Sequence, residues 1–372
     1  MKLLRVKADH FKNCEDGFTI DLVARSRKTA EDKEYELQEI APNLHVYSTM
    51  AFIGKNASGK TSAVELLDAC YSILGEFRLE GKHYSYDGIN LEIIFYHENY
   101  IYLYDVQLAA DSSLGNKAAF KNEHIYSKPY YKTNAREIYD KTSFTDLRDI
   151  GDLPEDTSNI FFVLKKKQTR AIYFDSFGNG SVTYQLMFKA LGNYAIDEKI
   201  LANILRIFDE NVEDLKKLDE HNYKLVFNGK ERNLSDTQLI YMLSSGTTKG
   251  LLLYTLMAAS LKEGFDLLVD EVENHFHKTL VENMISLYKD KTVNRHNATL
   301  IFTTHYCEVL DQMGRQDNLW ICKSGKQVSL SNMYTDYQIR PELLKSKQYY
   351  NNAFRTAVNY EELMSLKRIL KR

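Results

Sequence analysis

Residues 51–62 read Ala-Phe-Ile-Gly-Lys-Asn-Ala-Ser-Gly-Lys-Thr-Ser, which has the residue types and spacing of a phosphate-binding loop. The pattern G-x-x-x-x-G-K-[ST] follows an expected strand and precedes an apolar-periodic run, as such a loop requires. Its two glycines let successive backbone N–H groups turn inward, where the positive end of the next helix reinforces an anion site. We therefore expect nucleotide binding by Gly54, Lys55, Asn56, Ala57, Ser58, Gly59, Lys60, Thr61 and Ser62.

Two residues of this loop have predicted roles of their own. Lys60 would reach the β- and γ-phosphates and act in catalysis, and the Thr61 hydroxyl would ligate Mg²⁺. ATP and Mg²⁺ are thus the expected ligands.

A second candidate for the same chemistry is the apolar run 265–269, which ends in Asp270 and Glu271. This is a Walker B pattern. At the exposed end of a parallel strand beside the loop, Asp270 would hold the Mg²⁺ shell and Glu271 would orient and polarise the attacking water. A strand that ends in two acids can equally start a turn, so this pattern alone leaves both interpretations open.

Two further stretches complete the set. The buried-type strand 299–304 ends in His305, which could meet the γ-phosphate or could be a structural histidine. Residues 243–247, Leu-Ser-Ser-Gly-Thr, precede a strong apolar helix, and Ser244, Ser245 and Gly246 are candidate nucleotide contacts. Hydroxyls and a glycine at a helix start are also an ordinary capping arrangement.

The elements that must position these residues follow from hydrophobic periodicity and turn residues. We expect a loop at 25–39 and a hairpin at 90–108 that turns at residues 97–99. The expected strands are 3–11, 18–24, 43–54, 223–227, 265–269, 299–304 and 318–323, and the expected helical stretches are 61–79, 183–218, 251–261 and 360–372.

Composition narrows the class of protein. The chain has 372 residues, 44% of them hydrophobic, and can bury a large core in two lobes. A net charge of −3 gives no global argument for nucleic acid or an anionic membrane. Cys14, Cys70, Cys307 and Cys322 are scattered, which favours the reducing cytoplasm over a zinc or disulfide framework. The longest apolar run, 251–261, is too short for a membrane span.

Two local features bear on nucleic acid. The tyrosines of the hairpin could stack on bases, but aromatics at period two are also ordinary strand residues. Lys165, Lys166 and Lys167, with Arg170 close behind, could bind nucleic acid or a partner, although a charge run is usually a solvated face.

Taken in order, the phosphate loop, the Ser-Ser-Gly-Thr helix start, the Asp-Glu strand and the His-terminated strand resemble an ABC-type ATPase head. The chain is similar to the SMC, RecF and OLD-like group, particularly to small AAA-annotated ATPases of bacterial antiphage defence systems. Phe11-Lys12-Asn13 and the run Asp-Glu-Val-Glu-Asn-His-Phe-His at 270–277 belong to this resemblance. Transporter heads usually continue Asp-Glu-Pro instead.

The resemblance implies an α/β P-loop NTPase fold of the ABC-head type, with a mixed sheet, an antiparallel N-terminal subdomain and an α-rich insertion. It implies nucleotide contacts at Lys12 and Asn13 and a head-to-head homodimer in which Ser244 and Gly246 of one copy close on the loop of the other. The expected divisions are 1–108 (first ATPase lobe), 109–235 (inserted α+β or helical region), 236–340 (second lobe) and 341–372 (basic helical tail).

Several positions depart from the group pattern. The Gln that links Mg²⁺ to the lobe interface has two candidates, Gln107 and Gln168, neither in a convincing context. Glu273 and His277 match the OLD-like pattern but could simply pair with each other. His275 and His277 lack the third ligand that a metal site would need.

The leading functional hypothesis is an ATP-hydrolysing, dimerising sensor or scaffold subunit of an antiphage defence system. The insertion is too short for an SMC coiled coil, and the tail after His305 is too short for a TOPRIM nuclease, so the effector, a nuclease or toxin, should be a separate chain. The alternative is a RecF-like, DNA-binding repair or maintenance ATPase, in which Lys165, Lys166 and Lys167 would contribute to DNA binding.

Overall fold

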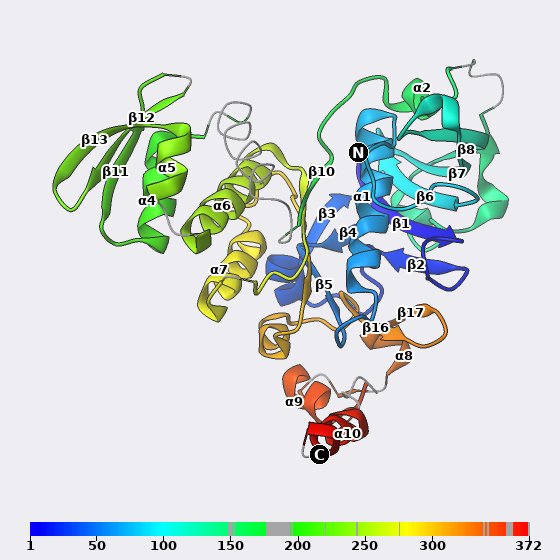
Figure 1. The fold of residues 1–372 in the computed structure, drawn as a ribbon. Helices are drawn as coiled ribbons and strands as arrows, with labels where there is room; N and C mark the ends of the chain where they lie inside the picture. Colours follow the sequence, from blue (N-terminus) through cyan, green and yellow to red (C-terminus); the bar gives the residue numbers. More distant parts are fainter. Residues whose placement is uncertain are drawn as a thin grey trace.

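Two six-stranded sheets organise the chain in this computed structural model (Figure 1). The structure describes residues 1–147, 151, 153–175, 194, 196–219, 221–242, 245–274, 276–337, 339–340, 342–354 and 360–370. Among these residues, none of the helices combines the length and apolar character that a membrane span needs.

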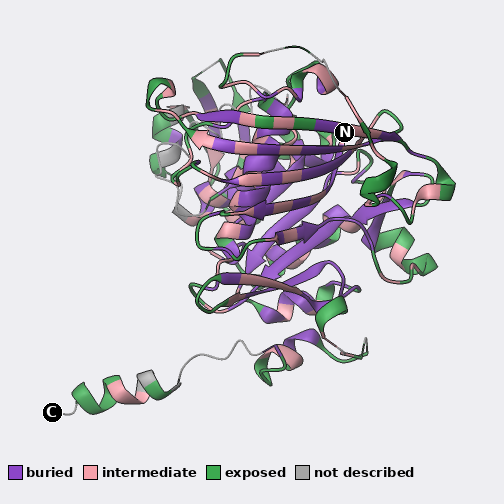
Figure 2. Ribbon diagram, turned by 90° about the vertical axis from the view of Figure 1, so that its right-hand side faces the viewer, coloured by how far each residue is buried: buried purple, intermediate pink, exposed green. Residues whose placement is uncertain are grey.

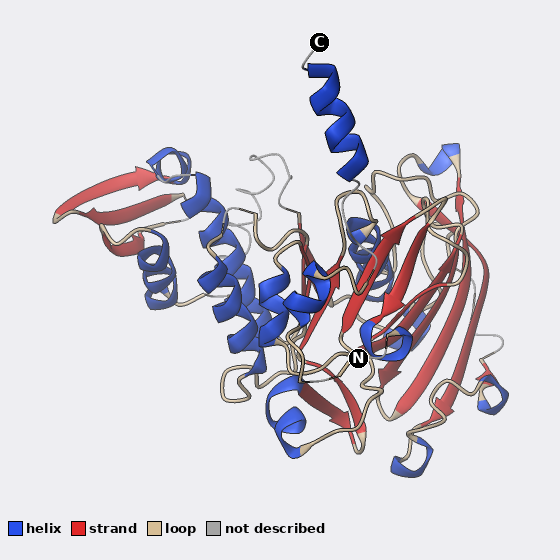
Figure 3. Ribbon diagram, turned by 90° about the horizontal axis from the view of Figure 1, so that it is seen from below, coloured by secondary structure: helices blue, strands red, loops and turns tan. Residues whose placement is uncertain are grey.

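The first sheet, sheet A, is antiparallel and has the order β2-β1-β6-β7-β8-β9. Seen from below in Figure 3, its strands lie side by side at one end of the molecule. The predicted hairpin is confirmed: β6 pairs with β7 around Glu98 and Asn99, whose positive φ angles (48° and 67°) suit a tight turn. The strands of sheet A are β1 (Lys2–Asp9), β2 (Phe18–Asp21), β6 (Asn90–His97), β7 (Tyr100–Ala110), β8 (Ala118–Pro129) and β9 (Thr145–Asp146).

The second sheet, sheet B, has the order β10-β14-β15-β5-β16-β17. All neighbours are parallel except β16 and β17, so the carboxyl ends of its first five strands meet at one edge. Ligands of open α/β sheets bind at such an edge. The strands of sheet B are β10 (Ala171–Phe174), β14 (Asp266–Val269), β15 (Leu300–Thr304), β5 (Thr49–Ile53), β16 (Leu319–Ser324) and β17 (Val328–Asn332).

Helix α1 (Lys60–Glu76) packs between the two sheets, because apolar side chains cover most of its circumference: Val64, Leu67, Tyr71 and Leu74 on one side, and Leu66, Ala69, Cys70 and Ile73 beside them. They share a core with Phe52 of β5 and with strands of sheet A. Helices α6 (Ser245–Glu263) and α7 (Lys278–Lys289) cover the other face of sheet B and form a second core. Figure 2 shows the buried strands at the centre of the molecule.

The segment that follows β10 in the sequence contains a strand where a helix was predicted for residues 183–218. A three-stranded sheet of β11 (Val212–Lys217), β12 (Asn222–Phe227) and β13 (Lys230–Ser235) lies beside α4 (Glu198–Phe208) and α5 (Asp236–Met242), at the end of the molecule away from sheet A (Figures 1 and 3). The helical prediction for 212–217 is wrong. Val212 and Leu215 are three residues apart in the sequence, which is helical spacing. In the strand, a bulge between Val212 and Asp214 allows both side chains to be buried. The predicted residues 183–193 lie outside the described part of the chain.

The prediction of a solvated loop at 25–39 is also wrong in its second half. A π-helical turn, η1 (Asp32–Glu36), leads into β3 (Leu37–Ala41), which pairs with β4 (Leu44–Tyr47). Glu36 and Gln38 are buried because Lys289 and the carbonyl of Ala298 bind them from far along the chain.

The remaining elements are short or terminal. They are η2 (Ser112–Leu114), η3 (Lys132–Asn134), η4 (Lys141–Ser143), α2 (Phe161–Leu164), η5 (Cys307–Gln312), α8 (Met333–Asp336), α9 (Lys345–Tyr350) and α10 (Tyr360–Leu370). Helix α10 projects from the rest of the protein in Figure 2.

The domain boundaries predicted from the sequence stay a prediction. Within the described residues, β8 extends sheet A beyond residue 108, and β10 belongs to sheet B.

Candidate nucleotide site

The predicted phosphate loop joins β5 to α1 at the carboxyl edge of sheet B, and both of its glycines are required sterically. A Cβ on Gly54 would lie 2.3 Å from Ser58 Oγ and 2.6 Å from the carbonyl oxygen of Cys322. Gly59 has φ +90° and faces Val328, whose side chain would lie 2.2 Å from an added Cβ. The loop therefore folds back closely on itself and is held from the side by β16 and β17.

Lys60 is buried within this loop, at 5% exposure. Its ammonium donates to the carbonyl oxygens of Gly54 (3.1 Å) and Lys55 (3.3 Å) and lies 2.9 Å from Nε2 of His305. Burial lowers its pKa, and nearby acidic groups act in the opposite direction. The amine thus lies within the loop, and its hydrogen-bond partners among the described residues are neutral.

The other loop residues differ in exposure. Asn56, Ala57 and Thr61 are exposed, and Lys55 and Ser62 are half-buried. Ser58 is buried, and its Oγ has no hydrogen-bond partner among the described residues.

Thr61 and Asp270 form the candidate Mg²⁺ position. The Thr61 hydroxyl donates to Asp270 Oδ2 at 2.8 Å, and the Thr303 hydroxyl donates to Oδ1 at 2.6 Å. Burial raises the pKa of Asp270, and the two hydroxyl donors partly offset this. A carboxylate and a hydroxyl fit Mg²⁺, which takes oxygen ligands and usually completes its shell with water and phosphate.

Glu271 follows directly and has an uncommon backbone conformation, with φ +48°. Its N–H donates to the Thr303 hydroxyl at 2.7 Å, and its Oε2 accepts from the Asn274 amide at 2.5 Å. Its Oε1 lies 3.9 Å from Nε2 of His305. The structure thus brings Lys60, Thr61, Asp270, Glu271 and His305 together at one edge of sheet B.

His305 follows β15 and lies between the lysine and the acids. Burial lowers its pKa, with a further contribution from the charge of Lys60. A neutral imidazole can accept a hydrogen bond from the Lys60 ammonium, so a single nitrogen links the histidine to the loop.

The segment containing Lys12 and Asn13 flanks the loop. Val328 N–H donates to the carbonyl oxygen of Asn13 at 2.8 Å, and the same Val328 packs on Gly59. Lys12 forms an ion pair with Glu65 on α1. Both residues are exposed beside the loop.

The residues of the Ser-Ser-Gly-Thr stretch are only partly described. Ser244 lies outside the described residues, and Ser245 and Gly246 form the first residues of α6. Because α6 and α1 cover opposite faces of sheet B, the two helices do not pack against each other.

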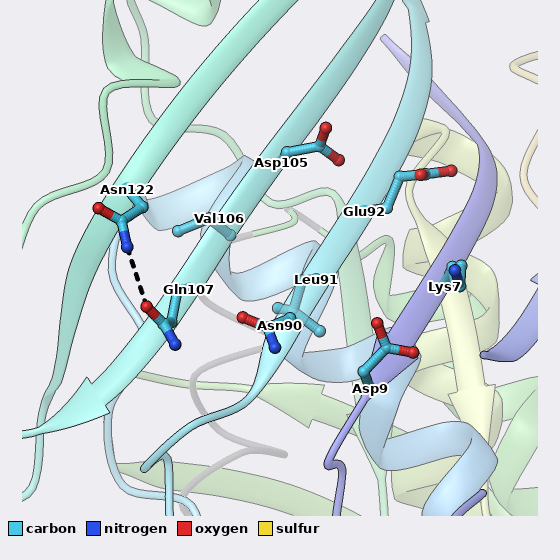
Figure 4. A pocket seen from close by; sticks show the side chains of 9 residues that line it. All are labelled: Lys7, Asp9, Asn90, Leu91, Glu92, Asp105, Val106, Gln107 and Asn122. Carbon is cyan, nitrogen blue, oxygen red and sulfur yellow. Dashed lines mark hydrogen bonds between the residues drawn. The ribbon is translucent and has the colours of Figure 1, made fainter. Parts of the chain in front are cut away.

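Neither Gln candidate lies at the site. Gln107 is on β7, in a polar pocket of about 250 Å³ on sheet A, where Asn122 donates to it at 3.0 Å (Figure 4). Gln168 N–H donates to the carbonyl oxygen of Gly75, near the C-terminal end of α1. A helix of 17 residues is about 25 Å long, so this contact is far from the phosphate loop at the other end of α1. The exposed Lys165, Lys166 and Lys167 are at that far end too.

Sequence reasoning missed Asp175. It directly follows β10, whose Phe174 pairs with Val269, so it stands beside Asp270 and adds its charge to that residue's surroundings. The signal was a short apolar run ending in an acid, residues 171–175, in a part of the chain with no clear periodicity.

The suggested pairing of Glu273 with His277 is wrong for the described geometry. Glu273 binds the backbone N–H of His305 at 2.5 Å, whereas His277 caps α7 by accepting from Thr279 N–H. His275 lies outside the described residues, and the described part of the chain holds no group of three or more His, Cys, Asp or Glu side chains placed for a metal.

Comparison with known proteins gives one family and several structural likenesses. Residues 50–311 match the family described as "AAA domain, putative AbiEii toxin, Type IV TA system". Comparison with curated protein sequences gives no match.

Among solved structures, the chain is similar to the SMC head domain from Thermotoga maritima, with 13% identity, a TM-score of 0.42, and coverage of 89% of this chain and 99% of that one. It is similar to an SMC head bound to the C-terminal winged-helix domain of ScpA (11% identity, TM-score 0.47, coverage 89% and 97%). It is also similar to the recombination mediator RecF with ATP (12% identity, TM-score 0.35, coverage 88% and 99%).

The matched segment contains the phosphate loop, the Walker B strand β14 and His305, and it spans more than half of the chain. The α/β architecture, with a mixed sheet behind the loop and an antiparallel N-terminal subdomain, agrees with the fold class predicted from the sequence. The chain therefore belongs to the family of AAA domains described as putative AbiEii toxin, Type IV TA system.

Proposed function

We propose that this protein hydrolyses ATP at the carboxyl edge of sheet B. The observation that carries the proposal is the convergence of Lys60, Thr61, Asp270, Glu271 and His305 from two loops and one helix start onto one edge. Phosphoryl transfer is catalysed mainly by positioning and electrostatic stabilisation, and these residue types supply both.

Each residue has a role in the proposed reaction. Lys60 binds the β- and γ-phosphates, together with the loop N–H groups. Thr61 and Asp270 hold Mg²⁺, which neutralises charge on the phosphate oxygens when bound. Glu271 accepts a hydrogen bond from the attacking water and orients it, and His305 binds the γ-phosphate.

We further propose that a second copy of the chain completes the site. Residues that close on the γ-phosphate are expected at Gly246, in the first turn of α6, and at Ser244, which precedes this helix in the sequence. Since α6 and α1 cover opposite faces of sheet B, contacts from α6 to the loop would come from another copy. Homodimerisation through ATP would follow, and hydrolysis would loosen it.

The biological role we propose is that of a cytoplasmic sensor or scaffold subunit in bacterial antiphage defence, acting on a separate nuclease or toxin. Membership of a family named for toxin–antitoxin systems supports this role. The four cysteines, all buried free thiols, suit a reducing compartment.

The variant Glu271→Gln tests the composite site. It keeps the size of the side chain and removes the carboxylate, so ATP should bind but turnover should fall by about 100-fold or more. Light scattering after size exclusion should then show a dimer with saturating ATP and a monomer without it.

The control is Glu92→Gln, which changes a carboxylate of the sheet A pocket and should keep the ATP turnover of the unmodified chain. A Glu271→Gln protein that binds ATP tightly but stays monomeric at micromolar concentration contradicts the composite site.

A further inference from the structure

Glu273 is a buried carboxylate that the proposed reaction does not use directly. It is 8% exposed and follows the Walker B acids by two residues. Its Oε1 accepts the backbone N–H of His305 at 2.5 Å, and its Oε2 is buried with no hydrogen-bond partner in the described part of the chain. A side chain on one loop therefore holds the main chain of another.

This contact lies where the sheet stops supporting the histidine. The pairing of β15 with β5 ends at Thr304 and Ile53, so His305 is the first residue beyond the ladder. The partly buried backbone N–H of His305 needs an acceptor, and Glu273 provides the one that the strand no longer does. This hydrogen bond restrains the direction in which the His305 side chain leaves the strand.

The turn at residues 271–276, which contains Glu273, is held against β15 by backbone N–H groups. Val272 N–H donates to the carbonyl oxygen of Thr303 at 3.0 Å, and Glu271 N–H donates to the Thr303 hydroxyl. Phe276 N–H donates to the carbonyl oxygen of Glu273 at 3.1 Å, which fixes the turn on its other side. The Glu273 carboxylate thus extends from a braced turn.

From these contacts we propose that Glu273 is a positioning residue for ATP hydrolysis: it anchors the main chain of His305 and so fixes the imidazole between Lys60 and Glu271. The inference rests on the proposed function of this site. His305 Nε2 lies 2.9 Å from Lys60 and 3.9 Å from Glu271 Oε1, so a small rotation of the backbone would move it out of reach of both.

The anchor needs an acceptor oxygen more than it needs a charge. Only one of the two carboxylate oxygens bonds to His305, and a glutamine carbonyl oxygen can accept the same hydrogen bond. The charge makes that bond stronger, because hydrogen bonds to ionised acceptors are roughly twice as strong as neutral ones. It also opposes the lowering of the His305 pKa by burial.

Glu273→Ala and Glu273→Gln separate these contributions. Because misplacing a catalytic group by about 1 Å can cost roughly 100-fold, kcat should fall by about 10- to 100-fold in the alanine variant. KM for ATP should change less than about twofold, since Lys60 and the loop are untouched. The glutamine variant should recover most of the lost kcat.

A double-mutant cycle with His305→Ala tests whether Glu273 acts through the histidine. The alanine at 305 keeps the backbone N–H but has no imidazole to position. Glu273→Ala should therefore lower kcat by less than about twofold in that background, although it lowers the melting temperature equally in both backgrounds.

Two results would overturn the inference: the same fold-loss of kcat with and without the imidazole, or equal losses in the glutamine and alanine variants. Failure of the proposed function is distinguishable, because the unmodified chain itself would then bind no ATP or show no turnover. Should Glu273→Ala fold poorly, Glu273→Leu, which fills similar space but has no acceptor oxygen, takes its place in the cycle: a loss of kcat that is equal with and without His305→Ala contradicts the anchor.

Discussion

Two polar sites of this chain bring cationic side chains close to several carboxylates, and they differ in how the charges are satisfied. In the sheet A pocket of Figure 4, Glu92 forms ion pairs with Arg5 and Lys141, and Asp9 accepts the N–H of Gly17. At the edge of sheet B, the acids bind hydroxyl and N–H groups instead, and within the described residues Lys60 forms no ion pair with any of them.

Because of this difference, we interpret the sheet A pocket as stabilising the fold and the edge of sheet B as the candidate nucleotide site. A cation that is already paired with a carboxylate has little attraction left for an anionic ligand. A buried lysine whose hydrogen-bond partners are neutral keeps its attraction for an anionic ligand. Acidic residues nearby are therefore compatible with binding a phosphate.

The largest expected effect comes from removing the lysine of each site in turn. Lys60→Ala should lower ATP turnover by about 100-fold or more, because it removes the central cation of the loop. Lys141→Ala, which removes one of the two cations paired with Glu92 of the sheet A pocket, should leave turnover within about twofold. Phosphate release under saturating ATP measures both, and comparable losses in the two variants would erase the distinction between the sites.

A smaller, metal-specific effect is expected from Asp270→Asn. The substitution keeps the shape of the side chain but removes the charge of the proposed Mg²⁺ ligand, so turnover at 1 to 2 mM Mg²⁺, a typical assay range, should fall by about 100-fold and partly recover at higher Mg²⁺. A Mg²⁺ titration of the rate measures this. A variant whose rate has the same Mg²⁺ midpoint as the unmodified chain would remove Asp270 from the ligand set.

The smallest effect concerns stability in the sheet A pocket. Burial raises the pKa of Asp105, and the neighbouring Glu92 raises it further, so the folded state disfavours the ionised form. Asp105→Asn should therefore stabilise the protein at pH 7, by less than about 1 kcal/mol. The gain should disappear below about pH 4, where the unfolded chain also protonates this group. Urea unfolding at both pH values measures it, and a gain that persists in acid would contradict the stated cause.

The sequence was informative where local pattern and final contact coincide. The phosphate loop, the hairpin at Glu98 and Asn99, and the strand ending in Asp270 depend on neighbouring residues, so their types suffice to predict them. The order of the strands within sheet B is harder to predict from the sequence. Motif residues at the carboxyl ends of several strands still indicate that these strands are parallel and lie near one another.

The sequence failed where partners from distant segments decide the structure. The bulge at Val212 disguises a strand as a helix, and buried Glu36 resembles a loop residue because its partner, Lys289, is far along the chain. The contact of Glu273 with His305 joins two loops through one side chain and one N–H. Periodicity contains no information about such pairings.

The position of β5 has a consequence for how the chain is made. This strand is buried along its whole length, and its neighbours in the sheet are β15 and β16, which begin at Leu300 and Leu319. On the ribosome, the strand that carries the loop must wait without either neighbour until synthesis has passed residue 300. Nascent chains truncated before residue 300 should therefore expose an unpaired apolar strand, and we expect them to depend on chaperones to avoid aggregation.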